Sequence, residues 1–353
     1  MTKQKIKRIL FRCDATAETG VGHLSRCLAL AEALRRLGKT CHFIGHWSGL
    51  SVKMLQHASF TSQPSTAATG SEADAESIIV ASEQGAVGVL IDSYQIDVRW
   101  LKQLSERGVK IVLIDDFASL GNYESCLGVI NFTVEAPKLN YPGLSGPRVA
   151  RGPRYFPVRE KLINLRKRKH HSASEKPKRA LITMGGGDPK KMTLPVYNAL
   201  KTLMPELQLR ALVKNGAAIA KVAGLNPEDF PDQSGDLAKH YLWADCCVSG
   251  GGLTKYECGY LGLPVAIFSQ TQEQQMETDA FCSKKLGWDL TPLSKKKRWK
   301  ERLELFVNDK NMNKNAQLAS RRVFSENSSD RAASMVWRLF TSKDLPSVQP
   351  RIK

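Results

Sequence analysis

Short apolar runs alternate with amphipathic stretches along most of the chain. In the first half, runs typical of buried strands cover 8–13, 41–45, 88–93, 109–115 and 127–132. Residues 24–37 carry apolar side chains at helical spacing, and 97–107 is also predicted to be a helix, whereas 61–76, rich in Ser, Thr and Ala, is predicted to be a loop. Strands this apolar, separated by helices, indicate a parallel sheet covered on both faces.

The same alternation restarts after a basic interruption. Residues 161–178 contain the run RKRKHHSASEKPK and are predicted to be a linker. Later strands are predicted at 180–184, 207–213, 245–249 and 265–269, and later helices at 193–203, 254–261 and 331–340. The sequence therefore predicts two α/β domains, 1–160 and 179–325, followed by a helix and tail at 326–353.

The net charge of the chain indicates which classes of molecule it could bind. The 353 residues include 52 Lys and Arg against 34 Asp and Glu, a net charge of +18, which favours a nucleotide sugar, a nucleic acid or an anionic membrane surface. The basic runs 284–285 and 295–298 are typical of a solvated helix face, with peripheral contact to an anionic membrane as the alternative; no nucleic acid partner is predicted. The eight cysteines show no C-x-x-C spacing, and neither a signal peptide nor a membrane span is found, so a cytoplasmic location is expected.

A glycine-rich turn opens the first predicted helix. Gly20 and Gly22 precede His23, and backbone without side chains at a helix start lets N–H groups approach an anion. His23 is a candidate general base, and a histidine that caps the helix is the alternative. Because Ser25 replaces the third glycine of G-x-G-x-x-G, a nicotinamide site is not indicated.

Polar residues end three predicted strands of the first half: Asp14, then Asp92 and Tyr94, then 115–116. The carboxyl ends of parallel strands meet at one sheet edge, where open α/β sheets bind ligands. Tyr94 is a candidate contact to a sugar hydroxyl, and an ordinary loop-capping role is the alternative for each aspartate.

The second half has two further glycine-rich segments. One contains Gly186, Gly187 and Asp188; the other is the turn 249–254, before a predicted helix, where N–H groups could bind a diphosphate. Glu257, one turn into that helix, is a candidate ligand of a ribose diol, although Thr254 and Glu257 also have the spacing of a capping box. The loop 270–275 is rich in side-chain amides that suit sugar hydroxyls. No zinc pattern, P-loop or hydrolase elbow is seen, and no metal or cofactor is predicted.

These motifs carry a resemblance that covers most of residues 5–280. The first is the pattern Arg12-x-Asp14-x5-Gly20-x-Gly22-His23-x2-Arg26-Cys27. It resembles the N-terminal signature of the hydrolases of pseudaminic acid biosynthesis that act on UDP-2,4-diacetamido-2,4,6-trideoxy-β-L-altrose. The likeness continues through 91–94, 114–116, 151–153 and 185–189, and 250–264 looks like the nucleotide-binding segment of the lipid-II-forming N-acetylglucosaminyltransferases.

The resemblance implies a GT-B-like α/β fold, with two Rossmann-like domains facing across a cleft and the last helix packing back on the first domain. It implies hydrolysis, with inversion, of a UDP-linked 2,4-diacetamido-2,4,6-trideoxyhexose to free sugar and UDP. His23 would activate water, while Asp14 and Tyr94 would order sugar and water. The residues expected to bind the UDP-sugar are Gly20, Gly22, Arg26, Gly186, Gly187, Asp188, Gly251, Gly252, Leu253, Thr254, Glu257, Glu273 and Gln274.

The chain departs from this family at one position. The family usually carries Asn-Gln where this chain has Glu273-Gln274, which changes the charge beside the expected sugar site. The alternative function is therefore a glycosyltransferase of the same architecture that passes a sugar to a lipid-linked or glycan acceptor. A nucleotide-sugar sensor without activity is a third hypothesis.

Overall fold

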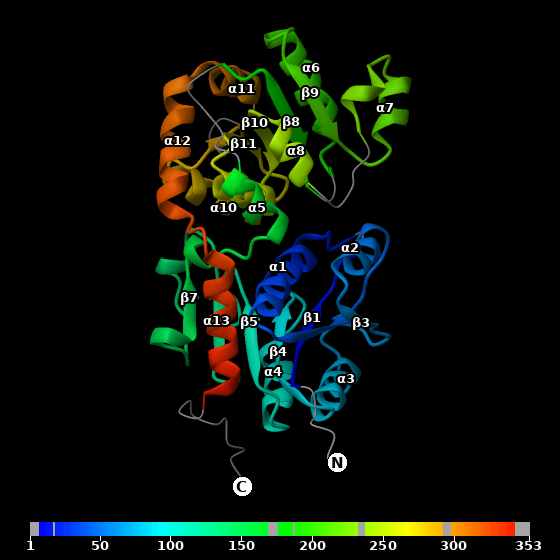
Figure 1. Cartoon of the computed structure of the whole chain (residues 1–353), viewed down its shortest axis with the longest axis vertical. Coiled ribbons are helices and arrows are strands. Elements are labelled where there is room, and N and C mark those ends of the chain that lie inside the picture. Colours follow the sequence, from blue (N-terminus) through cyan, green and yellow to red (C-terminus); the bar gives the residue numbers. More distant parts are fainter. Residues whose placement is uncertain are drawn as a thin grey trace. The chain divides into compact units, whose positions relative to one another are not determined.

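The computed structural model describes residues 7–16, 18–168, 176–185, 188–231, 237–291 and 298–342. The chain forms two compact units, which are described separately (Figure 1). Unit 1 contains the described residues up to Glu160 and those from Asn327 onward, and unit 2 spans Lys161–Glu326.

Unit 1 is built on seven parallel strands in the order β3-β2-β1-β4-β5-β6-β7. The strands are β1 Arg8–Cys13, β2 Thr40–Gly45, β3 Thr61–Pro64, β4 Ala86–Asp92, β5 Ile111–Ile114, β6 Gly128–Asn131 and β7 Val149–Arg151. The chain order reverses between β1 and β4, which pair from Ile9 and Gly88 to Cys13 and Asp92. The carboxyl ends of these two strands therefore form the topological switch point, where sheets of this kind bind ligands.

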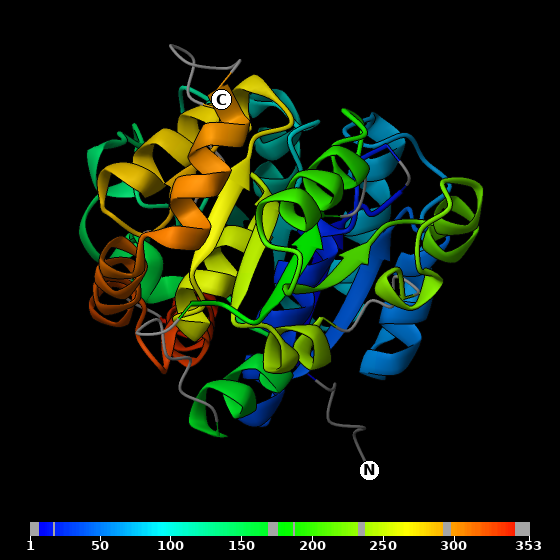
Figure 2. The same cartoon turned by 90° about the horizontal axis from the view of Figure 1, so that it is seen from above.

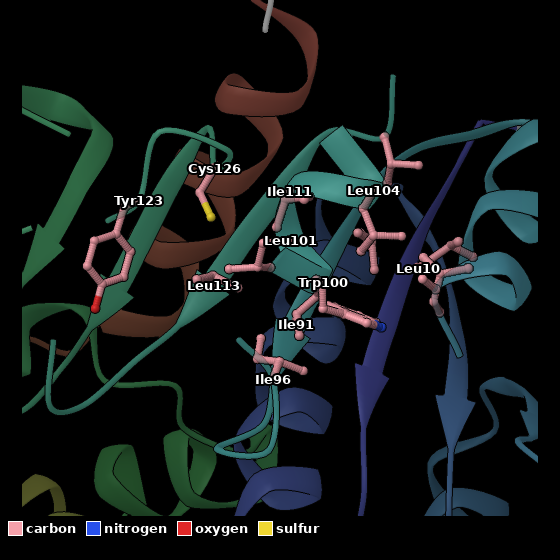
Figure 3. Close-up of a cluster of buried hydrophobic side chains, with 14 of the residues drawn as sticks. Leu10, Ile91, Ile96, Trp100, Leu101, Leu104, Ile111, Leu113, Tyr123 and Cys126 are labelled. Atoms are coloured by element: carbon pink, nitrogen blue, oxygen red, sulfur yellow. The ribbon is translucent and has the colours of Figure 1, made fainter. Parts of the chain in front are cut away.

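Helices cover both faces of the unit 1 sheet. They are α1 Gly22–Arg36, α2 Leu50–Ala58, α3 Glu72–Glu83, α4 Val98–Glu106 and α13 Ser328–Thr341. The buried side chains of α4, Trp100, Leu101 and Leu104, face the sheet. There they belong to the same hydrophobic core as Leu10 of β1 and Ile91 of β4 (Figure 3). This core has the continuous apolar strands expected of a parallel sheet buried on both faces.

The last helix, α13, lies against α1 and completes unit 1 (Figure 1). The backbone N–H of Val158 donates to Ser329 Oγ at 2.6 Å, and the Lys39 ammonium lies 3.9 Å from the centre of the Trp337 ring. Residues from both ends of the chain thus share one core.

Unit 2 has a smaller parallel sheet in the order β12-β11-β10-β8-β9, seen in green to yellow in Figure 2. The strands are β8 Arg179–Thr183, β9 Gln208–Leu212, β10 Cys246–Gly250, β11 Val265–Phe268 and β12 Trp288–Asp289. The helices are α5 Glu160–Arg168, α6 Thr193–Leu203, α7 Gly216–Val222, α8 Ala238–Trp243, α9 Leu253–Leu261, α10 Gln272–Ser283, α11 Trp299–Asn308 and α12 Lys310–Val323. Short 3-10 turns occur at Ala136–Lys138, Gly146–Arg148, Pro153–Tyr155 and Pro227–Asp229.

Most predicted elements are confirmed, and α6 has the predicted bounds. The predicted loop at 61–76 is wrong, because it contains the edge strand β3 and the start of α3. All four residues of β3 are exposed and give no apolar signal, while Ser71 caps α3 by accepting the N–H of Asp74. This edge strand and capped helix carry too little apolar pattern for the sequence to predict them.

The predicted linker also differs in its first part. Residues 160–168 form α5, in which Leu162 and Leu165 are buried. Residues 169–175, and 343–353 of the expected tail, lie outside the described residues. No helix in the described part of the chain is both long and apolar enough to cross a bilayer.

Candidate functional site

His23 lies at the start of α1, at the switch point of the unit 1 sheet. Gly20, with φ +72°, turns the chain from β1 into the helix. The Nδ1 atom of His23 lies 2.7 Å from Asp92 Oδ1, at the end of β4, and the imidazole is 15% exposed. The N-cap of α1 is Val21, with no side-chain cap among the described residues, so the alternative of a capping histidine is not what the structure has. A carboxylate only accepts hydrogen bonds, so Nδ1 is the ring nitrogen that donates to Asp92.

Arg26, one turn further along α1, fixes the carboxylate that holds His23. Its Nε and Nη2 donate to the two Asp92 oxygens, each at 2.6 Å, and its Nη1 donates to Asp116 Oδ2 at 2.5 Å. Burial opposes ionisation of Asp92, yet the charges of Arg26 and His23 hold its pKa well below the usual range. The guanidinium of Arg26 is buried and occupied by these carboxylates, so its expected contact with substrate stays a prediction.

Tyr94 forms the exposed side of this cluster. The residue as a whole is 53% exposed, and its ring meets the His23 imidazole edge-on, with 4.7 Å between ring centres. Its hydroxyl donates to Asp116 Oδ2 at 2.6 Å, and desolvation together with this carboxylate raises the pKa of Tyr94 above its usual value. The structure therefore places Tyr94, unlike Arg26, where a bound molecule could touch it.

Asp92 and Asp116 were not among the predicted site residues, although their strand-end positions indicated them. Asp116 Oδ1 is buried and has no hydrogen-bond partner within the described ranges. Together the two aspartates carry two negative charges against one on Arg26. A proton on His23 would balance the remaining negative charge, so the cluster is suited to a histidine that accepts a proton.

Asp14 belongs to a different cluster. Arg12 is fully buried and donates from Nη1 to Asp14 Oδ1 at 2.5 Å and from Nε to Asp74 at 2.9 Å. Asp14 also accepts hydrogen bonds from the backbone N–H of His46 at 2.8 Å and the Thr69 hydroxyl at 2.7 Å. These contacts join β1, β2 and the segment before α3. The expected catalytic role of Asp14 stays a prediction, and within the described part of the chain Asp14 makes no hydrogen bond or ion pair with His23.

In unit 2, the glycine turn follows β10 at the carboxyl edge of the sheet. A Cβ on Gly250 would lie 2.7 Å from the Met184 carbonyl oxygen, and one on Gly251 would lie 2.8 Å from Gln274 Cβ, so packing requires both glycines. A Cβ on Gly252 would meet nothing within 4 Å. Gly252 is the N-cap of α9 and, within the described ranges, no side chain caps this helix. The first-turn N–H groups are therefore available to an anion.

The alternative interpretation of Thr254 and Glu257 as a capping box is wrong. The helix starts at Leu253, so Thr254 lies inside its first turn and not at the N-cap. Glu257 instead accepts a hydrogen bond from the Tyr241 hydroxyl, with 2.6 Å between Tyr241 Oη and Glu257 Oε2. Its expected contact with a ribose stays a prediction.

The remaining predicted residues of unit 2 lie near the same sheet edge. Gln274 Oε1 accepts the N–H of Gly251 at 3.2 Å and that of Gln270 at 3.0 Å, which joins the glycine turn to the amide-rich loop. Glu273 is exposed in the first turn of α10, where backbone N–H and the Thr271 hydroxyl lower its pKa. Asp188 accepts the N–H groups of Met192 and Thr193 and so caps α6. Gly186 and Gly187 lie outside the described residues.

No family model matches the chain. An uncharacterized protein of Methanocaldococcus jannaschii is 22% identical over 314 residues, which cover 81% of this chain and 60% of that protein. The chain thus spans about 60% of the length of this curated relative.

Several solved structures resemble nearly the whole chain. MurG of Acinetobacter baumannii is 15% identical with a TM-score of 0.62 and covers 94% of this chain and 99% of its own. The spinosyn forosaminyltransferase SpnP is 13% identical with a TM-score of 0.65 and covers 95% of this chain and all of its own. LpCGTa, solved with UDP, is 13% identical with a TM-score of 0.61, covering 96% and 100%. At this level of identity, the comparison shows the fold: the chain has the predicted GT-B-like α/β fold.

Proposed function

We propose that the chain is an enzyme that transfers a glycosyl group from a nucleotide sugar, with His23 as the general base. The observation that carries this proposal is the 2.7 Å contact between His23 Nδ1 and Asp92, whose orientation is fixed by Arg26. Nε2 would take the proton from the oxygen that attacks the anomeric carbon, while the nucleoside diphosphate leaves. General-base catalysis of this kind contributes about 10²- to 10⁴-fold in rate.

A nucleotide sugar suits the second unit and the overall charge. The uncapped start of α9 offers N–H groups and the positive end of the helix dipole to a diphosphate. The net charge of +18 favours an anionic substrate. UDP is the nucleotide bound to the similar structure LpCGTa, which supports a UDP-sugar here.

The acceptor distinguishes two candidate functions. The likeness to solved glycosyltransferases and the glutamate at position 273 favour a hydroxyl acceptor on a lipid-linked sugar or glycan. The signature from Arg12 to Cys27 favours water, and hence hydrolysis of a UDP-2,4-diacetamido-2,4,6-trideoxyhexose. In both reactions His23 removes a proton from an attacking O–H group.

The decisive experiment measures UDP release from a panel of UDP-2,4-diacetamido-trideoxyhexoses without an acceptor, together with UDP binding by calorimetry. Release of UDP and free sugar that is lost in His23→Ala would establish hydrolysis. UDP binding without turnover in water would favour transfer, and lipid-linked acceptors would be added next. A wild-type protein that binds neither UDP nor the UDP-sugars would refute the proposal. His23→Ala is expected to lower kcat more than UDP affinity, because the proposed role of His23 is to take a proton from the attacking O–H group and not to bind the diphosphate.

A further inference from the structure

Lys190 extends across the end of β10 in unit 2. It follows β8, yet its ammonium donates to the Ser269 carbonyl oxygen, just after β11, at 2.7 Å. In the sheet, β10 lies between β8 and β11, with Gly250 paired to Phe268 and Ser249 paired to Thr183. The Lys190 side chain must therefore cross the carboxyl end of β10, where the glycine turn begins.

The peptide group between Ser269 and Gln270, which accepts the hydrogen bond from Lys190, is also joined to the glycine turn. Its carbonyl belongs to Ser269 and its N–H to Gln270, and that N–H shares Gln274 Oε1 with the N–H of Gly251. The Lys190 ammonium and the backbone of Gly251 are thus linked through one peptide group and one amide oxygen. A cation is held beside the start of α9, which has its own positive end.

A second observation marks this place as a binding site for a polar molecule. The Gln270 side chain is 7% exposed, and neither its Nε2 nor its Oε1 has a hydrogen-bond partner in the described part of the chain. The hydroxyl of Thr183, at the end of β8, is also buried without a partner among those residues. Buried polar groups are nearly always paired, so unpaired ones gathered at a sheet edge indicate that a ligand completes them.

We propose that Lys190 is a phosphate-binding residue that contacts the diphosphate of the nucleotide sugar in unit 2; this inference rests on the proposed function. An ammonium has three N–H donors, and the described structure uses one of them, on Ser269. The other two would donate to phosphate oxygens, while the N–H groups at the start of α9 bind the same diphosphate. Lys190 is exposed, as contact with a bound anion requires.

The test compares UDP with uridine, which lacks the phosphates, by calorimetry and by competition on the full chain. In Lys190→Gln we expect UDP to bind roughly ten- to a hundredfold more weakly, the loss typical of one charge-assisted hydrogen bond. Uridine affinity should stay unchanged, and the salt dependence of UDP binding should become weaker. Lys190→Arg should recover most of the UDP affinity. The matched control is Lys221→Gln, which removes the same charge from an exposed position on α7 and should leave UDP binding intact.

Each other outcome has a distinct meaning. If the affinities for UDP and uridine weaken equally, Lys190 only holds the two loops together and the inference is wrong. It is also wrong if UDP binds Lys190→Gln as tightly as the wild type. If the wild type does not bind UDP, the proposed function itself fails.

Discussion

Arg26 and Asp92 form a two-pronged ion pair, with both hydrogen bonds at 2.6 Å and both side chains buried. Planar pairs of this kind hold a carboxylate in one orientation. Asp92 therefore presents Oδ1 to His23 from a fixed position, and the histidine ring is held without depending on its exposed neighbours.

Asp92→Asn should lower kcat by about 10²- to 10⁴-fold, because an amide can donate to Nδ1 and thereby favour the wrong tautomer of His23. Losing a buried ion pair also lowers stability, so the matched control is Asp74→Asn. Asp74 is a fully buried partner of Arg12, and among the described residues it makes no hydrogen bond or ion pair with His23, Arg26 or Asp92. We expect the free energy of unfolding to fall in both variants, but kcat to fall only in Asp92→Asn. Steady-state kinetics measures kcat, with the two variants compared under conditions where equal fractions of each are folded. Equal kcat values in the two variants would contradict the assignment.

Tyr94→Phe should lower kcat/KM by no more than about tenfold. The change removes the hydrogen bond to Asp116 but keeps the ring against His23, and such a bond contributes about 1 kcal/mol. Tyr94→Ala removes both the hydrogen bond and the ring contact, and should lower kcat/KM further than Tyr94→Phe does. If the alanine variant keeps full activity, Tyr94 does not contact the substrate.

Gly252→Ser should stabilise the protein and weaken UDP binding. A serine at this N-cap has room for its side chain, and its hydroxyl can accept a first-turn N–H, a gain over glycine of roughly a few tenths of a kcal/mol in the free energy of unfolding. The same hydroxyl would compete with a phosphate. Thermal unfolding and calorimetry measure the two effects, and Gly252→Ala, which adds a Cβ without an acceptor, is the control. If Gly252→Ser unfolds with a higher free energy but binds UDP as tightly as the wild type, the start of α9 does not bind phosphate.

The stability contributed by Asp14 should depend on pH. Burial raises the pKa of Asp14, but Arg12, the His46 N–H and Thr69 lower it more, so its pKa in the folded state is below the unfolded value of about 3.9. The contribution is therefore complete above that value and is lost as pH falls towards the folded pKa. Asp14→Asn should be less stable than the wild type by about 3 kcal/mol at neutral pH, and this difference should shrink below about pH 4.

Urea unfolding across this pH range measures the Asp14 effect. The control is Asp330→Asn, which breaks an exposed pair with Arg36 and should cost less than about 1 kcal/mol at neutral pH. A difference between wild type and Asp14→Asn that stays constant down to pH 3 would mean that the Asp14 pKa is not lowered in the folded protein.

The sequence predicted those parts of the molecule in which local pattern and burial agree. The apolar strands of both sheets and the amphipathic helices α1 and α6 follow from spacing alone. The strand β3 was missed because an exposed edge strand has no apolar face. The capping box failed because the helix begins one residue before Thr254, a shift smaller than sequence patterns resolve.

The candidate site was predicted in outline but not in its connections. Strand-end positions indicated that Asp92, Tyr94 and the aspartates at 115–116 would converge near His23. Which carboxylate contacts the histidine, and that Arg26 bridges two of them, depends on side-chain packing between segments 66 to 90 residues apart. Strand-end position also groups Asp14 with these residues. In the structure, however, Asp14 forms an ion pair with Arg12 in a separate cluster.

Because α13 belongs to unit 1 but follows unit 2 in the chain, synthesis and folding proceed in different orders. While a ribosome is making the chain, the face of α1 that contacts α13 has no partner until residues 328–341 have been added. Unit 2 is already complete by then and can fold within the nascent chain, as domains commonly do. Unit 1 is therefore expected to reach its native state last, although it is the first to emerge, and its early folding intermediates would present apolar surface to chaperones.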